Sequence, residues 1–100
     1  MVDPPFESLL HTNEVAVAYF WSPTCRECKF WGPQIESLCK SRDIPLIKID
    51  VSVDLDVALQ YDVLSLPTVI FLRGGQAEKR LTSMSISMAE IESMMNTLTR

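Results

Sequence analysis

The apolar positions of the chain gather into short runs that predict strands. The longest of these runs is apolar throughout and partly β-branched and aromatic, which is typical of a strand buried on both faces of a parallel sheet. The run that follows Gly74-Gly75 is more polar, and the tight turn at these glycines makes it antiparallel to its predecessor. The predicted strands are Val15–Trp21, 45–50, 68–72 and 77–81.

Between these runs, apolar residues recur at helical spacing. The predicted helices are Phe6–His11, Cys25–Ser41, 54–61 and a last helix that opens at Ser87. Pro33 falls inside the longest helix and is expected to bend it rather than end it, because the apolar pattern resumes beyond the proline. Asp54 is placed to cap its helix, and Ser87 and Glu90 have the spacing of a capping box.

The order of elements predicts an α/β fold. A strand, a helix and a second strand form a βαβ unit, whose crossover is right-handed and whose strands are parallel. Helices must then cover both faces of the sheet, which gives three α/β/α layers around a four-stranded mixed sheet. The chain shows no repeat or linker, so residues 1–100 are predicted to form one domain.

Composition narrows the classes of function. The chain has 100 residues, 47% of them hydrophobic, and a formal net charge of −4, which together exclude a disordered chain and argue against nucleic-acid binding. Its longest apolar run, Val15–Trp21, is far shorter than the roughly 20 residues of a membrane span. The first residues carry no basic segment before an apolar stretch, so we expect a cytoplasmic protein with no membrane partner.

The three cysteines carry the candidate chemistry, because an odd count in a reducing compartment favours redox or metal chemistry over structural bridges. Cys25 and Cys28 lie at the start of a helix, where the helix dipole favours a thiolate; Cys25 can then attack a disulfide and Cys28 can resolve the product. Cys39 lies about 16 Å further along the helix and cannot share a metal or a disulfide with Cys28. Two readings stay open beside redox chemistry: a metal or cluster held across a dimer, and an inert pair.

At this point the chain resembles the thioredoxin family over about residues 13–100. The matching features are Phe20-Trp21, Cys25-x-x-Cys28-Lys29, Pro33, Ile49-Asp50, Leu66-Pro67-Thr68 and Gly74-Gly75, whereas Arg26-Glu27 departs from the family's usual middle pair. The resemblance implies a monomeric protein-disulfide reductase without a bound organic cofactor or metal. Its electrons would come from a reductase of the thioredoxin-reductase type or from another dithiol donor. A glutaredoxin is a weaker match, because Gly74-Gly75, Lys29 and the proline-containing helix fit thioredoxin better.

The resemblance also implies roles for individual residues. It implies a cis bond at Pro67, with the neighbouring backbone holding the substrate like an added strand. The implied substrate-binding residues are Trp21, Thr24, Ser65, Leu66, Pro67 and Ser83. Four residues near the cysteines are expected to tune the redox chemistry: Tyr19, Arg26, Glu27 and Lys29.

The departures from the family pattern bear on mechanism. Tyr19 and Leu46 stand where the family has a buried aspartate and its lysine partner, and neither can act as a base near neutral pH. Cys28 must then lose its proton to water, to Glu27 or to the substrate. The family's first strand is expected to be missing or reduced, because few residues precede Val15 and Pro4-Pro5 disfavours a strand. These departures also keep a non-catalytic binding module open as an alternative.

Overall fold

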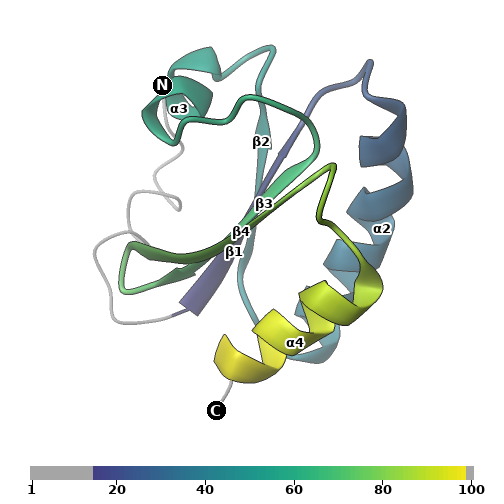
Figure 1. Cartoon of the computed structure of the whole chain (residues 1–100), viewed down its shortest axis with the longest axis vertical. Coiled ribbons are helices and arrows are strands. Elements are labelled where there is room, and N and C mark those ends of the chain that lie inside the picture. Colours follow the sequence, from purple (N-terminus) through teal and green to yellow (C-terminus); the bar gives the residue numbers. More distant parts are fainter. Residues whose placement is uncertain (1–14, 99–100) are drawn as a thin grey trace.

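A computed structural model describes residues 15–98 of the chain (Figure 1). Its elements, in chain order, are β1 (Val15–Trp21), α2 (Arg26–Ser41), β2 (Leu46–Asp50), α3 (Leu55–Gln60), β3 (Thr68–Arg73), β4 (Gln76–Thr82) and α4 (Met88–Leu98). The predicted elements within this range are all confirmed, with ends that agree or differ by one residue. The predicted helix Phe6–His11 and the expected loss of the family's first strand concern residues outside those described.

The strands of the described range form one mixed sheet in the order β2-β1-β3-β4. β1 lies in the centre and pairs in parallel with β2, as the βαβ unit requires, and antiparallel with β3. The β3–β4 hairpin is antiparallel and turns at Gly74 and Gly75, which both adopt positive φ angles that a glycine reaches at little cost.

The two faces of the sheet bury separate cores. Successive residues of a strand point to opposite faces, so Val17 and Tyr19 join the core under α2 and α4. Ala16, Ala18 and Phe20 join the core on the side of α3. Figure 1 shows α2 and α4 on one side of the sheet and α3 on the other. This arrangement confirms the three-layer α/β/α prediction.

The helices end at or next to the residues that the sequence predicted, but one predicted side-chain cap is not formed. α2 continues through Pro33 to Ser41, as predicted. The Glu90 backbone N–H donates to Ser87 Oγ at 3.2 Å, which supplies the Ser87 half of the capping box. Asp54 occupies the N-cap position of α3, but its side chain makes no capping hydrogen bond. The backbone N–H groups of Val57 and Ala58 bond instead to the Asp54 carbonyl.

Candidate active site

The register of the sheet gathers the predicted site residues at one end of three strands. Phe20 pairs with Thr68, and Thr68 pairs with Thr82. The next residues, Trp21 and Ser83, therefore lie at the same end of the sheet as Pro67. The turn that carries the cysteines leaves β1 at this end and leads into α2.

Cys25 and Cys28 sit at the first turn of α2. Cys25 is the N-cap residue, and its Sγ accepts the backbone N–H of Cys28 at 3.2 Å. The two cysteines form a disulfide with their Cα atoms 5.3 Å apart. Cys25 is partly exposed, whereas Cys28 is 4% exposed and belongs to the core under α2. A substrate can therefore reach the first sulfur but not the second.

The loop before β3 presents backbone at the same end. The Leu66–Pro67 peptide bond is cis, and Pro67 is buried. The Thr68 hydroxyl donates to the Ser65 carbonyl at 2.7 Å, which fixes the loop around the proline. Ser65 is exposed, and Leu66 packs against both cores. This loop can offer its backbone to an extended peptide.

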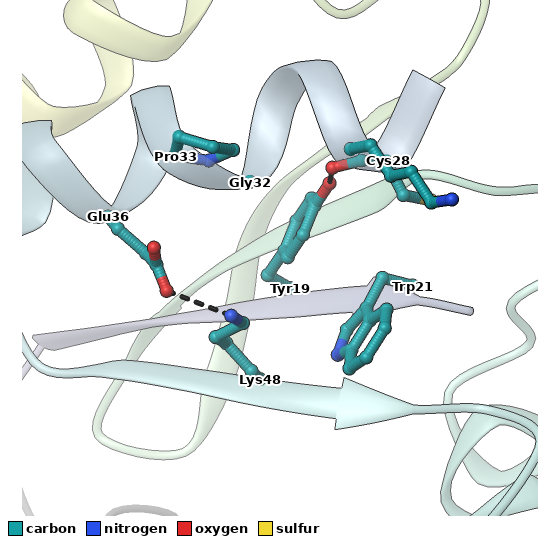
Figure 2. A pocket seen from close by; sticks show the side chains of 8 residues that line it. Tyr19, Trp21, Cys28, Gly32, Pro33, Glu36 and Lys48 are labelled. Atoms are coloured by element: carbon teal, nitrogen blue, oxygen red, sulfur yellow. Dashed lines mark hydrogen bonds and ion pairs between the residues drawn. The ribbon is translucent and has the colours of Figure 1, made fainter. Parts of the chain in front are cut away.

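A cavity of about 250 Å³ lies beneath Cys28, between α2 and strands β1 and β2 (Figure 2). Its lining residues are Tyr19, Trp21, Cys28, Lys29, Gly32, Pro33, Glu36 and Lys48. The Tyr19 hydroxyl donates to the Cys28 carbonyl at 2.7 Å. Burial, and next the negative charge of Glu36, raise the pKa of Tyr19 to about 12. The Tyr19 hydroxyl is therefore neutral near pH 7 and tethers the start of α2 to the central strand.

The cavity also holds an ion pair that the sequence interpretation missed. Lys48 Nζ lies 2.8 Å from Glu36 Oε1 and 5.6 Å from the centre of the Trp21 ring. The β1–β2 register places Lys48 directly beside Tyr19, while Leu46 pairs with Val17 two residues earlier. The chain thus has a lysine at this cavity, although Leu46 replaces the one expected from the family. A usable signal was present, because Cys28, Gly32 and Glu36 recur every four residues and so share one face of α2.

The remaining predicted residues lie on the rim of this region. Thr24 is exposed, and its Oγ1 is 3.2 Å from the Ser22 hydroxyl. Arg26, Glu27 and Lys29 are exposed on the first turn of α2, and Lys29 also borders the cavity. Ser83 is half-buried just after β4. The structure therefore brings the predicted substrate-binding residues to one end of the sheet.

Cys39 is separate from this site, as predicted. It is a free thiol, 2% exposed, in the core under α2. Desolvation by burial raises the pKa of its thiol to about 12. Within residues 15–98, no group of three or more His, Cys, Asp and Glu side chains could hold a metal ion. No helix in that range is long and apolar enough to cross a membrane.

A three-layer fold with a Cys-x-x-Cys pair at a helix start and a cis-proline loop beside it defines the class of thioredoxin-fold proteins with a dithiol site. The thioredoxin family model matches residues 1–97, and the chain belongs to the thioredoxin family. A thioredoxin of Mycoplasmoides gallisepticum is 35% identical over 77 residues, which cover 75% of this chain and 77% of that protein.

Two further comparisons agree with this assignment. The bifunctional thioredoxin reductase/thioredoxin of Mycobacterium leprae is 31% identical over 78 residues; these cover 76% of this chain but only 17% of that longer protein. A crystal structure of a thioredoxin from Nicotiana alata superposes with a TM-score of 0.85 at 28% identity. The match covers 96% of this chain and 83% of that one.

Proposed function

We propose that this chain is a thiol–disulfide oxidoreductase that reduces protein disulfides. The observation that carries the proposal is the unequal burial of the two sulfurs at the start of α2. Cys25 is accessible at a helix N-terminus, where unpaired N–H groups and the helix dipole stabilise a thiolate. Cys28 is buried directly behind it, so that only Cys25 meets the substrate.

The reaction proceeds in two exchanges. The Cys25 thiolate attacks one sulfur of the substrate disulfide, which forms a mixed disulfide and releases the other sulfur as a thiolate. Cys28 then loses its proton and attacks Cys25 Sγ. This step forms the Cys25–Cys28 disulfide, releases the second substrate thiolate and completes the transfer of two electrons to the substrate. The Cα separation of 5.3 Å allows this bond to close within the first turn of α2.

The substrate segment lies across the end of the sheet. Its backbone pairs with the loop at Ser65 and Leu66, next to the cis Pro67. Trp21 and Thr24 border the segment on the side of the cysteines, and Ser83 borders it on the side of β4. The exposed charges of Arg26 and Glu27 have opposite signs beside Cys25 and tune its thiolate in opposite directions.

The partners follow from the electron balance. Each cycle leaves an oxidised pair, so a dithiol donor or a reductase must supply two electrons. The Mycobacterium leprae relative, whose name joins a thioredoxin reductase with a thioredoxin, supports a reductase of that type for this chain. We further propose that the protein works as a monomer in the cytoplasm, where such donors keep dithiols reduced.

The reduction of insulin disulfides by dithiothreitol tests the proposal. The wild-type chain should accelerate the appearance of turbidity as the insulin B chain precipitates. The Cys25→Ser variant should fall to the rate of dithiothreitol alone, because it has no attacking thiolate. The Cys39→Ala variant is the matched control on the same helix and should keep the wild-type rate.

A wild-type chain that does not accelerate the reaction would contradict the proposal and favour the binding-module alternative. A metal that copurifies with the wild-type chain and is lost in Cys25→Ser would instead favour the metal-binding alternative.

A further inference from the structure

The proposed function requires a group that accepts the proton of the Cys28 thiol. Cys28 must become a thiolate to attack Cys25, yet it is 4% exposed, so its proton has to leave through the cavity that borders this residue. The Tyr19 hydroxyl donates to the Cys28 carbonyl and is neutral near pH 7, since its pKa is about 12. A different acceptor must therefore communicate with the Cys28 sulfur.

The cavity beneath Cys28 leads to such an acceptor along one face of α2. Cys28, Gly32 and Glu36 line it at intervals of four residues, so they follow one another along the helix. Gly32 has no side chain to fill the space between the other two. A Cβ atom at this position would lie 3.6 Å from Tyr19 Cε2 and 3.8 Å from the Tyr19 hydroxyl. A methyl group at residue 32 would therefore occupy part of the space between Cys28 and Glu36.

The cavity has the size and the polar groups to hold water. Its volume of about 250 Å³ exceeds the roughly 30 Å³ that one water molecule occupies in the liquid. The side chains of Glu36 and Lys48, which line the cavity, supply polar groups with which water can form hydrogen bonds. Figure 2 shows the Glu36–Lys48 pair in the space below α2, while the Tyr19 hydroxyl points toward Cys28. Water in this space can bridge the Cys28 thiol to the Glu36 carboxylate.

We propose that Glu36 accepts the proton of Cys28 through water in this cavity, with Lys48 holding the Glu36 carboxylate in place. The inference rests on the proposed function, because it describes the second exchange of the same reaction. The Cys28 S–H bond breaks, its proton reaches Glu36 through water, and the sulfur keeps the electron pair with which it attacks Cys25. When a donor reduces the disulfide, the proton returns to Cys28 along the same path. Glu36 acts through water and is therefore a positioning residue.

The charged and titratable groups around Glu36 come from all three elements that enclose the cavity. Lys48 faces it from β2 at 2.8 Å, and Tyr19 faces it from β1. Cys28 and Lys29 border the same cavity from α2 itself. The charge of Glu36 contributes to the raised pKa of Tyr19, so its field reaches the hydroxyl that is bonded to Cys28. Lys48 is the cation that the geometry pairs with this carboxylate.

A stopped-flow reaction with the aromatic disulfide dithionitrobenzoate separates the two exchanges. Attack by Cys25 on this probe releases one coloured thionitrobenzoate, and resolution by Cys28 releases the second. In the Glu36→Gln variant the rate of the second phase should fall by about tenfold. This loss is smaller than the usual loss on removing a directly acting general base, because water lies between Glu36 and Cys28. The first phase should keep its wild-type rate.

Rescue by the conservative variant is the readout that a merely structural role would not move. Glu36→Asp should restore part of the second-phase rate that Glu36→Gln loses, because it returns a carboxylate to the cavity. Glu78→Gln is the matched control, since it breaks another exposed ion pair, between Arg73 Nε and Glu78 Oε1 at 3.1 Å, outside the cavity.

Gly32→Ala tests the path without changing any charge. Its methyl group would narrow the space between Cys28 and Glu36, and the second phase should slow while the first does not. A second phase that is unchanged in both Glu36→Gln and Gly32→Ala would overturn this inference but leave the proposed function standing. An equal slowing of the second phase in Glu78→Gln would do the same. A wild-type chain that releases no thionitrobenzoate in the first phase would overturn the proposed function itself.

Discussion

The two ends of α2 place the same side chain in opposite environments. At the N-terminal end, Cys25 is partly exposed, accepts a backbone N–H and is bonded to Cys28. Fourteen residues after Cys25, Cys39 is 2% exposed in an apolar core, and burial raises its pKa to about 12. The N-terminal end offers a backbone N–H to the sulfur, and the other end surrounds the thiol with apolar side chains that disfavour its charged form. Position on the helix, and not residue type, therefore decides whether a cysteine of this chain carries chemistry.

Alkylation of the reduced protein with iodoacetamide at neutral pH tests this difference between Cys25 and Cys39 most directly. Cys25 should react at least about a thousandfold faster than Cys39, because a thiol with a pKa of about 12 is almost wholly protonated and is also buried. Mass spectrometry of the digested protein measures both rates. Alkylation of Cys39 in the folded chain at a rate close to that of Cys25 would remove the distinction.

The stability of the protein at alkaline pH gives the next largest effect. The pKa of Cys39 is raised from 9.0 to about 12 in the folded chain, so its stabilising contribution is complete below pH 9 and is lost as the pH rises through 12. At about pH 11 the loss should reach roughly 2–3 kcal/mol. Cys39→Ala should show a smaller decrease in Tm than the wild type between about pH 8 and 11. Parallel Tm curves for the two proteins would contradict this explanation.

The hydrogen bond of Tyr19 can be tested at the N-terminal end of α2. Tyr19→Phe removes the 2.7 Å hydrogen bond to the Cys28 carbonyl and should lower the free energy of unfolding by about 1 kcal/mol in urea titrations. The pH profile of the disulfide exchange below about pH 9 should not change, since the Tyr19 pKa is about 12. A titration of the reaction that disappears only in Tyr19→Phe would assign the proton transfer to this hydroxyl instead.

One variant, with the smallest change among those described, should stabilise the protein rather than destabilise it. Gly32→Ala should raise the free energy of unfolding by about 0.5–1 kcal/mol, because alanine loses less conformational entropy in a helix. The new methyl group would meet Tyr19 at 3.6 Å, which is ordinary van der Waals contact. Urea unfolding measures the change. A destabilised variant would show that the space at Gly32 is tighter than this distance indicates.

Most of the fold could be predicted from local patterns. The apolar run Val15–Trp21 indicated a strand buried on both faces, and the structure confirms that prediction. Pro33 could be placed inside a continuing helix because the apolar spacing resumed beyond it. Asp54 was the local exception, since its side chain makes no capping hydrogen bond although it occupies the N-cap position.

The site could be predicted only as far as its motifs extend along the chain. Cys25, Cys28 and Pro67 lie in recognisable segments, so their positions followed from sequence. Glu36 and Lys48 lie in different elements, and their contact depends on how β2 registers beside β1. That register is a tertiary property with no local signal. The family pattern has a lysine at the position of Leu46. It gives no reason to consider Lys48, two residues further on.

The position of Trp21 allows hydration of the cavity to be followed by tryptophan fluorescence. Its side chain lines the cavity 5.6 Å from an ammonium group, and its ring nitrogen is buried. Indole emission moves to longer wavelength as the ring becomes hydrated. In a Trp31→Phe background, the remaining tryptophan would be an internal optical probe that follows hydration beside the dithiol while it is oxidised and reduced, without an added dye.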